Sequence, residues 1–358
     1  MVNTTTRDPS SPRPTVLVTG ITGPVGTAIA LDLARAGFAL RGSSRSEIRA
    51  SEWSRKYPEL GVDWEIIKDH EVSETDTYSK AVRGCSAVIH VAGPYTLTHL
   101  KGEDIMIRQV QGVKSILNAC SNEASVQRLV YTSTVAAIND DPHLGTGLGK
   151  TYTEEDWNPA TWEKGACTTG DHMAVTSYCA GKTVAEKAAW DFMSDRQPHF
   201  DLVTICPGTI YGEPMQVLNS LKDLDAAHAR LWSHITHALQ VVPKDPSPVF
   251  SNILDVAEAH LKALTWPKCG GNRYMVVSGY YSYARVFSIL RERFPEQADR
   301  FPIIPNNGLP VSPSFWNNCS KAEKELGMRW RTLEETVSTA AEVLFKLEKQ
   351  SSETPSTE

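Results

Sequence analysis

The sequence predicts an α/β fold in which a doubly wound parallel sheet is combined with a smaller, discontinuous C-terminal lobe. Apolar, strand-like runs alternate with helical patterns from residue 14 onward. The first of these runs ends in closely spaced glycines that lead directly into a helical pattern. Continuous apolar strands separated by helices indicate a parallel sheet covered on both faces. Right-handed crossovers then bring the carboxyl ends of the strands to one edge, where ligands bind.

The expected elements follow one another in a regular order. A first strand at 15–20 leads into a helix that Gly37 is placed to end. Further strands are expected at 38–45, 64–68, 86–93, 127–134 and 201–208. This alternation of strands and helices is typical of a Rossmann domain.

The rhythm changes after residue 208. Residues 209–247 are expected to be helical, 249–264 contains an amphipathic helix, and 272–279 adds one more strand. A final helix is expected at about 332–348. The predicted organisation is a disordered tail at 1–13, a Rossmann domain at 14–208 completed by about 248–279, a substrate-binding lobe formed by 209–247 and 280–348, and a disordered tail at 349–358.

Composition excludes several classes of partner. The 358-residue chain has a net charge of −6 and no basic run, so no nucleic-acid surface is expected. No segment approaches the roughly 20 apolar residues of a membrane span, and the first residues do not resemble a signal peptide. The seven cysteines are scattered without a C-x-x-C pair, which predicts neither disulfides nor a zinc site. We therefore expect a cytoplasmic protein with a small-molecule ligand and no metal.

The glycines after the first strand indicate what the domain binds. Gly20, Gly23 and Gly26 stand where a tight turn, a close backbone approach and close helix packing would each exclude a Cβ atom. A strand that turns into a helix leaves unpaired N–H groups at the helix start, and these groups attract anions. The stretch therefore predicts a site for the pyrophosphate of a dinucleotide.

The second strand indicates which dinucleotide is bound. NAD-binding folds place an acidic residue about 20 positions after the glycines, where it holds the ribose 2′-hydroxyl. That position is Arg45 in this chain, and Arg49 follows one helical turn later. Guanidinium groups suit the 2′-phosphate of NADP, so we expect NADP; the alternative is that both arginines belong to an ordinary solvated surface. Asp69, after the third strand, would either accept from the adenine amine or cap a helix.

A tyrosine and a lysine are placed for acid–base chemistry. Tyr178 and Lys182 are four residues apart, so they share one face of a helix. A neighbouring ammonium favours the phenolate and brings the pKa of a phenol towards the working range. Many helices contain this spacing by chance, but here it follows a dinucleotide loop and precedes the strand at 201–208. The fifth strand ends in Ser133 and Thr134, of which only one can face the reacting group because neighbours on a strand point apart.

These features resemble a known family. The glycine pattern, Arg45, the set Thr134–Tyr178–Lys182 and the sequence PGTIYG are similar to the extended short-chain dehydrogenase/reductases. Within that family, EEDWNPATWE and SYCAGKTVAEKAAWDF resemble the fungal methylglyoxal/aldehyde reductases, which are relatives of plant dihydroflavonol reductase. The resemblance covers about residues 14–345. It implies a Rossmann domain, NADPH as cofactor, and the reversible reduction of an aldehyde or ketone to an alcohol.

The resemblance also implies roles for individual residues. Tyr178 would donate the proton, Lys182 would hold the nicotinamide ribose and tune the tyrosine, and Thr134 would take the place of the family's catalytic serine. The implied cofactor contacts are Gly20, Thr22, Gly23, Pro24, Val25 and Gly26 at the pyrophosphate, Arg45 and Arg49 at the 2′-phosphate, Asp69 and His70 at the adenine, Val91, Ala92 and Gly93 at the adjoining ribose, Pro207, Thr209 and Ile210 at the carboxamide, and Ser220 elsewhere on the cofactor. The asparagine that the family often carries after the fourth strand is Gln111 here, so a proton relay at that position is not carried over.

Two other functions remain open, and several residues have two interpretations. A nucleotide-sugar epimerase or dehydratase of the same fold usually binds NAD, which Arg45 disfavours. A non-catalytic NADP-sensing regulator typically lacks the tyrosine–lysine pair. His234 and His237 are expected to be surface residues rather than metal ligands, and His90 a core or sheet-end residue. The residues that would either pack or line a substrate pocket are Trp157 and Trp162, with Tyr95, Val135, Tyr211 and Phe315 as further candidates for the pocket wall.

Overall fold

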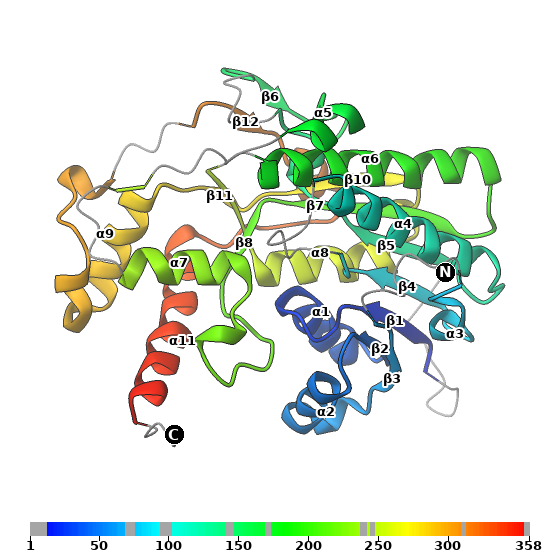
Figure 1. Ribbon diagram of the computed structural model, residues 1–358, viewed down its shortest axis with the longest axis horizontal. Helices are drawn as coiled ribbons and strands as arrows, with labels where there is room; N and C mark the ends of the chain where they lie inside the picture. The colour runs from blue at the N-terminus through cyan, green and yellow to red at the C-terminus, as the bar shows by residue number, and fades with distance from the viewer. Residues whose placement is uncertain are drawn as a thin grey trace.

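A parallel sheet of seven strands forms the centre of the protein in the computed structural model (Figure 1). The structure describes residues 13–68, 76–93, 102–140, 147–168, 173–236, 242–243, 248–308 and 313–353. The strands are β1 (Thr15–Thr19), β2 (Ala39–Ser44), β3 (Asp63–Ile66), β4 (Ala87–His90), β5 (Arg128–Thr132), β7 (Asp201–Pro207) and β10 (Asn272–Val276). The ends of each strand lie within three residues of the expected ends, and the doubly wound Rossmann fold is confirmed.

The strand order places a ligand crevice beside β1. The order across the sheet is β10-β7-β5-β4-β1-β2-β3, and every neighbouring pair is parallel. From β1 the chain first adds β2 and β3 on one side. It then returns to add β4, β5, β7 and β10 on the other side, so the strand order reverses between β1 and β4. In open α/β sheets the crevice at such a switch point, outside the carboxyl ends of the strands, receives the ligand.

Two hydrophobic clusters cover the two faces of the sheet because alternate strand residues point to opposite sides. Val16 and Val18 of β1 face α1 (Pro24–Arg35) and α8 (Ile253–Thr265). Leu17 points the other way, into a cluster with α4 (Gly102–Ser121) and α6 (Met173–Arg196). In Figure 1, α6 lies near the top of the view with α4 just below it, and α1 lies lower, beside β1 and β2. The shorter helices of this part are α2 (Glu47–Lys56), α3 (Ser79–Val82) and α5 (Trp162–Cys167).

A third hydrophobic cluster joins the helices at the left of Figure 1. It contains side chains of α7 (Ala226–Thr236), α9 (Tyr283–Arg293) and α11 (Leu333–Glu353). Beside these helices, β8 (Thr209–Tyr211), β9 (Val249–Asn252) and β11 (Gly279–Tyr280) form a three-stranded sheet. The remaining elements are β6 (Thr151–Tyr152), β12 (Trp316–Asn317), α10 (Ser320–Glu325) and the 3₁₀ turns η1 (Pro58–Leu60), η2 (Val135–Ala137), η4 (Leu221–Asp223), η5 (Pro267–Cys269), η6 (Pro295–Arg300) and η7 (Pro305–Gly308).

Three details differ from the sequence-based expectations. Residues 209–247, expected to be helical, begin with β8 and contain one longer helix, α7. The C-terminal helix continues to Glu353, five residues into the segment 349–358 expected to be a disordered tail, because its apolar face still packs at Leu344 and Leu347. Gly37 follows the cap of α1 rather than forming it: Ala36 is the C-cap, and Gly37 adopts the positive φ of +88° that the next position requires.

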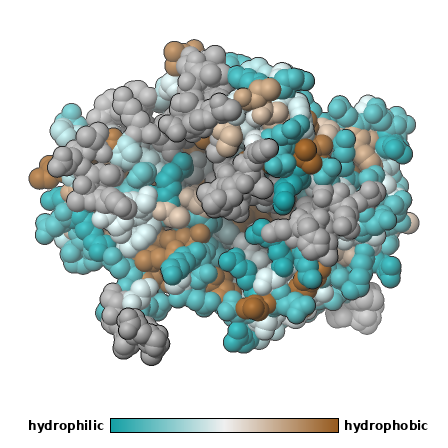
Figure 2. Space-filling view, viewed as in Figure 1, coloured by the Kyte–Doolittle hydropathy of each residue, from teal (hydrophilic) through white to brown (hydrophobic). Residues whose placement is uncertain are grey.

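Figure 2 shows one face of the molecular surface, which is largely polar where the described residues form it. The hydrophobic side chains on this face form small separate patches. None of the helices within the described ranges combines the length and the apolar composition needed to cross a bilayer.

Candidate active site

The glycine loop is shaped by two of its three glycines. Gly20 has a φ of +67°, and a Cβ atom there would lie 3.2 Å from the backbone of Ala92. A Cβ atom on Gly26 would lie 2.7 Å from the Cα of Ile21 and still closer to the carbonyl oxygen of Gly20. On Gly23 it would make only an ordinary contact, 3.4 Å from that oxygen. The protein itself therefore leaves the space beside Gly23 open, and the expected exclusion of a Cβ atom there by a close backbone approach to the pyrophosphate stays a prediction.

The start of α1 suits a phosphate group. Gly23 is the N-cap residue and Pro24 the first helical residue, and no side chain caps the helix. Thr22 and Val25 beside it are half-buried. The free N–H groups of a helix start, the open space at Gly23 and the backbone approach at Gly20 together fit a dinucleotide pyrophosphate.

Two arginines stand at the neighbouring strand end. Arg45 follows β2 directly, and Arg49 is in the first turn of α2, whose N-cap Ser46 accepts from the Arg49 amide at 3.3 Å. Both arginines are exposed. Because β1 and β2 pair in register up to Thr19 and Ser43, this strand end lies beside the glycine loop. Asp69 and His70, the residues expected at the adenine, lie outside the described residues.

The turn after β4 is tied to β1 by one threonine. The hydroxyl oxygen of Thr19 accepts from the amides of Val91 and Ala92 at 3.1 and 3.0 Å. It lies 2.9 Å from Nδ1 of His90, and the Thr19 hydroxyl donates its own proton there. His90 is then neutral with its proton on Nε2, in agreement with burial, which lowers the pKa of His90 to about 3, assisted by the charge of Lys182. His90 is thus the sheet-end core residue that was expected.

The catalytic helix α6 is anchored along one side. The Ser177 hydroxyl donates to the carbonyl of Gly165 in α5 at 2.8 Å, and a Cβ atom on Gly165 would lie 2.6 Å from that of Ala180. This close packing fixes the rotation of α6 about its own axis. Tyr178 is half-buried and lies one turn before Lys182.

Lys182 joins the ends of two central strands. Its ammonium donates to the carbonyl of Thr132 at the end of β5, at 3.4 Å, and lies 5.6 Å from the ring centre of Tyr131. A Cβ atom on Gly93, after β4, would lie 3.8 Å from the same nitrogen. Burial lowers the pKa of Lys182 to about 8, although the carboxylate of Glu186 acts in the opposite direction. The Lys182 side chain therefore reaches the edge of the sheet formed by the carboxyl ends of the strands, between β4 and β5.

The two hydroxyls after β5 have different partners. Ser133 donates to a carboxylate oxygen of Glu186 at 2.6 Å and is buried. The Thr134 hydroxyl donates to the carbonyl of Pro207 at the end of β7, at 3.3 Å, and accepts from the Ala136 amide at 3.2 Å. The Ser133 proton is thus committed inside the protein, whereas Thr134 lies at the strand edge beside Pro207.

The chain beyond β7 forms another border of the same edge. Thr209 and Ile210 belong to β8, which pairs with β9. The amide of Gly208 donates to the Ser251 hydroxyl at 2.8 Å. Ser220 caps η4, accepting from the Lys222 amide, so its hydroxyl has a structural partner already.

The comparisons with known proteins identify the family. The model of the 3-beta hydroxysteroid dehydrogenase/isomerase family matches residues 17–260, more than half of the chain. This chain belongs to that family. Among similar proteins, the NADPH-dependent methylglyoxal reductase GRE2 of Saccharomyces cerevisiae is 30% identical over 93% of this chain and 98% of its own length. The ketoreductase azaE of Aspergillus niger is 29% identical over 91% of this chain and 96% of its own.

A solved structure agrees with these relatives. The crystal structure of yeast methylglyoxal/isovaleraldehyde reductase Gre2 complexed with NADPH has a TM-score of 0.80 and 29% identity, and the match covers 94% of this chain and 99% of that one. The resemblance to the fungal methylglyoxal/aldehyde reductases is confirmed. The chain is accordingly an oxidoreductase of this family.

Sequence reasoning missed three residues around the tyrosine–lysine pair. Glu186 and Arg273 form a buried ion pair at 2.8 Å beneath α6. Gln109 of α4 is buried, and a Cβ atom on Gly181 would collide with its amide oxygen. Gln111, which takes the place of the family's asparagine, is exposed. The spacing Lys182–Glu186 was a usable signal, because it continues the same helical face by one turn.

Most of the residues that would either pack or line a substrate pocket are found to pack against other side chains. Val135, Tyr211 and Phe315 are buried in hydrophobic clusters, and Trp162 packs against Met106. The Trp157 ring lies 3.7 Å from the Arg273 guanidinium carbon. His234 contacts the ring of Tyr283 at 4.5 Å, and no set of metal ligands occurs in the part of the chain that the structure describes. Tyr95 and His237 lie outside the described residues.

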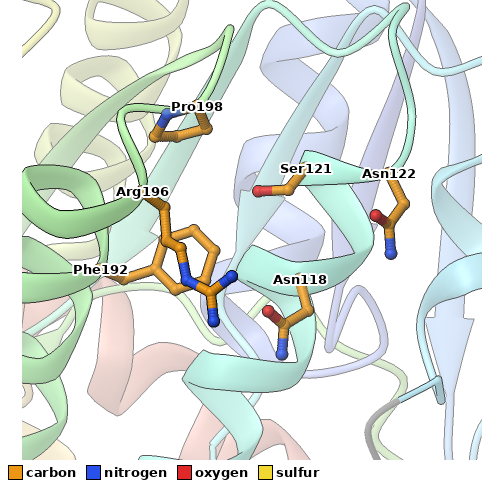
Figure 3. A pocket seen from close by; sticks show the side chains of 6 residues that line it. All are labelled: Asn118, Ser121, Asn122, Phe192, Arg196 and Pro198. Carbon is orange, nitrogen blue, oxygen red and sulfur yellow. The ribbon is translucent and has the colours of Figure 1, made fainter.

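A surface hollow elsewhere does not belong to this site. It has a volume of about 280 Å³ and is lined by residues at the C-terminal ends of α4 and α6, which Figure 3 shows as Asn118, Ser121, Asn122, Phe192, Arg196 and Pro198. Arg196 ends α6, and at 1.5 Å per residue it is about 27 Å along the helix from Tyr178. The hollow thus lies at the far end of the helix from Tyr178.

Proposed function

We propose that this protein is an NADPH-dependent reductase that converts the carbonyl group of a small aldehyde or ketone into an alcohol, with Tyr178 as proton donor. One observation carries the proposal. Lys182, on the same helix face as Tyr178, reaches Thr132 after β5 and the space beside Gly93 after β4. The acid–base pair therefore lies at the edge of the sheet that also bears the glycine loop. Relatives that use NADPH support the choice of cofactor.

The residues around the crevice would hold the cofactor in an extended form. The start of α1 would bind the pyrophosphate, and Arg45 with Arg49 would bind the 2′-phosphate through charge-assisted hydrogen bonds. The turn from Val91 to Gly93 would lie along a ribose, and Pro207 to Ile210 near the carboxamide. When bound, NADPH supplies a hydride to the substrate carbonyl carbon.

Tyr178 and Lys182 would handle the proton. A positive charge beside a phenol stabilises the phenolate, which makes the phenol a stronger acid. The Lys182 ammonium would provide that charge and would also donate to the nicotinamide ribose. Tyr178 would give its proton to the developing alkoxide, and solvent would restore it.

Thr134 would be the second donor to the developing negative charge. Its hydroxyl has only a long bond, 3.3 Å, to the Pro207 carbonyl, so it can turn to a substrate oxygen at low cost. Ser133 is unsuited to this role because its proton is held by Glu186 at 2.6 Å.

The test measures NADPH oxidation with small aldehydes, diketones and bulky aromatic ketones. We expect turnover with at least one class and a decrease in kcat of about 10²–10⁴-fold in Tyr178→Phe, with NADPH affinity within a few-fold. Tyr274→Phe is the matched control, because that hydroxyl donates to Glu325 on the distant α10 and should not affect the reaction. A Tyr178→Phe variant that keeps most of its kcat would refute the mechanism. NADPH binding without turnover of any carbonyl would favour a sensing role instead.

A reducing compartment, the cytoplasm, is part of the same proposal. All seven cysteines are free thiols, and six of them are buried. Disulfide-free chains with several cysteines are typical of reducing compartments. Imaging of a fluorescent fusion would test this location.

A further inference from the structure

A row of polar side chains crosses the sheet beneath α6. The pairing registers join Thr19 to His90, His90 to Tyr131, Tyr131 to Thr204, and Thr204 to Arg273, so the row spans β1, β4, β5, β7 and β10. All five side chains are buried. Buried polar groups are costly unless they are hydrogen-bonded, so a row of this length needs matching partners.

Glu186 of α6 is the hydrogen-bond acceptor for two residues of this row, Thr204 and Arg273. Its side chain is fully buried, and its carboxylate accepts from Thr204 at 2.8 Å and from Nε of Arg273 at 2.8 Å. It also accepts from Ser133, two residues beyond Tyr131, at 2.6 Å. One carboxylate thus joins the catalytic helix to β7, to β10 and to Ser133, the residue after β5 that precedes Thr134.

Four of the five N–H groups of Arg273 already have acceptors, two of them in the Glu186 carboxylate. One terminal nitrogen donates to the carbonyls of Glu154 and Asp156 at 2.6 and 2.9 Å, and the guanidinium stacks on Trp157. A buried ion pair is weak evidence of a stabilising function, because desolvation offsets much of the attraction between its charges. The pair therefore calls for a role beyond stability.

The position of Glu186 indicates that role. Tyr178, Lys182 and Glu186 follow at intervals of four residues, so they lie along one face of α6. Burial lowers the pKa of Lys182 to about 8, and the negative charge of Glu186 is the main influence that opposes this decrease. Other ionisable groups surround Lys182 and Glu186. They are Tyr178 on α6, His90 on β4, Tyr131 on β5, Cys206 on β7, Arg273 on β10, and Glu154 after β6.

We propose that Glu186 is a positioning residue of the reductase, serving as the buried counter-ion that keeps Lys182 charged while it fixes the end of β5 beside Thr134. The proposal rests on the proposed function. Arg273 holds this carboxylate in place, and one of its terminal nitrogens also donates to the carbonyls of Glu154 and Asp156.

The test compares the pH dependence of the wild type with that of Glu186→Gln. Removing the negative charge should let the Lys182 ammonium lose its proton more easily. We expect the alkaline limb of kcat to move to lower pH by about one to two units, within the range of about 1–3 units that a nearby opposite charge produces. The pH at which NADPH affinity falls should move by a similar amount. This second readout does not require turnover, so it distinguishes a failure of this proposal from a failure of the proposed function.

Two further variants separate charge from structure. Thr204→Val removes one hydrogen bond to Glu186 but leaves its charge, so it should lower the melting temperature without moving either pH limb. The double variant Glu186→Gln/Arg273→Met removes both buried charges and avoids an unpaired arginine, so it keeps the test open if the single variant fails to fold. Its pH limbs should move in the same acid direction but by less, because the loss of the positive charge of Arg273 partly offsets the loss of the negative charge of Glu186. Unchanged limbs in the folded glutamine variants, or an equal shift in Thr204→Val, would overturn the proposal.

Discussion

Gly23 and Gly26 should respond to the same substitution in opposite ways, although they lie in one loop. An alanine at Gly26 places its Cβ 2.7 Å from the Cα of Ile21 and closer still to the Gly20 carbonyl, so the backbone must move. Overpacking of this kind costs about 1–3 kcal/mol. At an unfolding entropy of about 2.1 cal/mol/K per residue, each kcal/mol corresponds to about 1.3 °C for a chain of 358 residues, so the melting temperature should fall by about 1–4 °C.

An alanine at Gly23 meets no such obstacle in the protein. Its Cβ would lie 3.4 Å from the nearest atom, the Gly20 carbonyl oxygen, and the φ of −83° suits any residue. The loss of a good N-cap residue and the gain from a stiffer unfolded chain should nearly cancel, leaving stability within about 1 kcal/mol. The methyl group would instead occupy the open space at the start of α1. NADPH affinity should therefore fall by about tenfold or more, that is by about 1.4 kcal/mol.

Two measurements on each variant decide the matter. Thermal unfolding without ligand reports the packing cost, and a fluorescence titration with NADPH reports the affinity. Gly23→Ala serves as the packing control for Gly26→Ala. A Gly26→Ala protein as stable as the wild type would refute the steric reasoning. A Gly23→Ala protein that binds NADPH normally would refute the placement of the pyrophosphate at this helix start.

The remaining predictions concern the cofactor phosphate and the strand-end hydroxyl. Arg45→Asp should weaken NADPH binding tenfold or more and leave NADH binding unchanged, because it replaces a charge-assisted hydrogen bond of about 1.5–3 kcal/mol by repulsion. Equal loss of affinity for both cofactors in parallel titrations would show that Arg45 does not bind the 2′-phosphate. Thr134→Val should lower kcat by about 10²–10³-fold while Thr134→Ser stays active, since one donor to the developing oxyanion is removed and then restored. Ser133→Ala should retain most of its kcat in the same steady-state assay, and the reverse ranking of Ser133 and Thr134 would show that the serine, not the threonine, faces the substrate.

The central sheet could be predicted from the sequence because of how its strands are buried. A parallel strand covered on both faces is a continuous apolar run, as in VLVT of β1 and AVIH of β4, and the run stands out from the polar segments around it. Short strands offer no such pattern. β6, β11 and β12 have two residues each, and they exist only because distant segments happen to meet there.

The candidate site could be predicted where its geometry is local. Tyr178 and Lys182 are one helical turn apart, and the glycine loop is continuous in sequence. The partner of Glu186 could not be found in this way, because Arg273 is 87 residues further along the chain and reaches it only through the pairing of β10 with β7. The exposure of Gln111 and the burial of Gln109 depend on how α4 turns against α6, which a count of residues does not determine.

The packing of α8 against the same face of the sheet as α1 also constrains how the chain folds as it is made. The apolar side chains of α1 and of the first strands share one cluster with Ile253, Val256 and Ala257 of α8. More than 200 residues separate the two helices, and at about 5–20 residues per second this corresponds to roughly 10–40 s of synthesis. During that interval the apolar face of the sheet is covered by α1 but not yet by α8. A nascent chain stalled before residue 250 should therefore recruit chaperones, whereas one released after β10 should be able to close its own core.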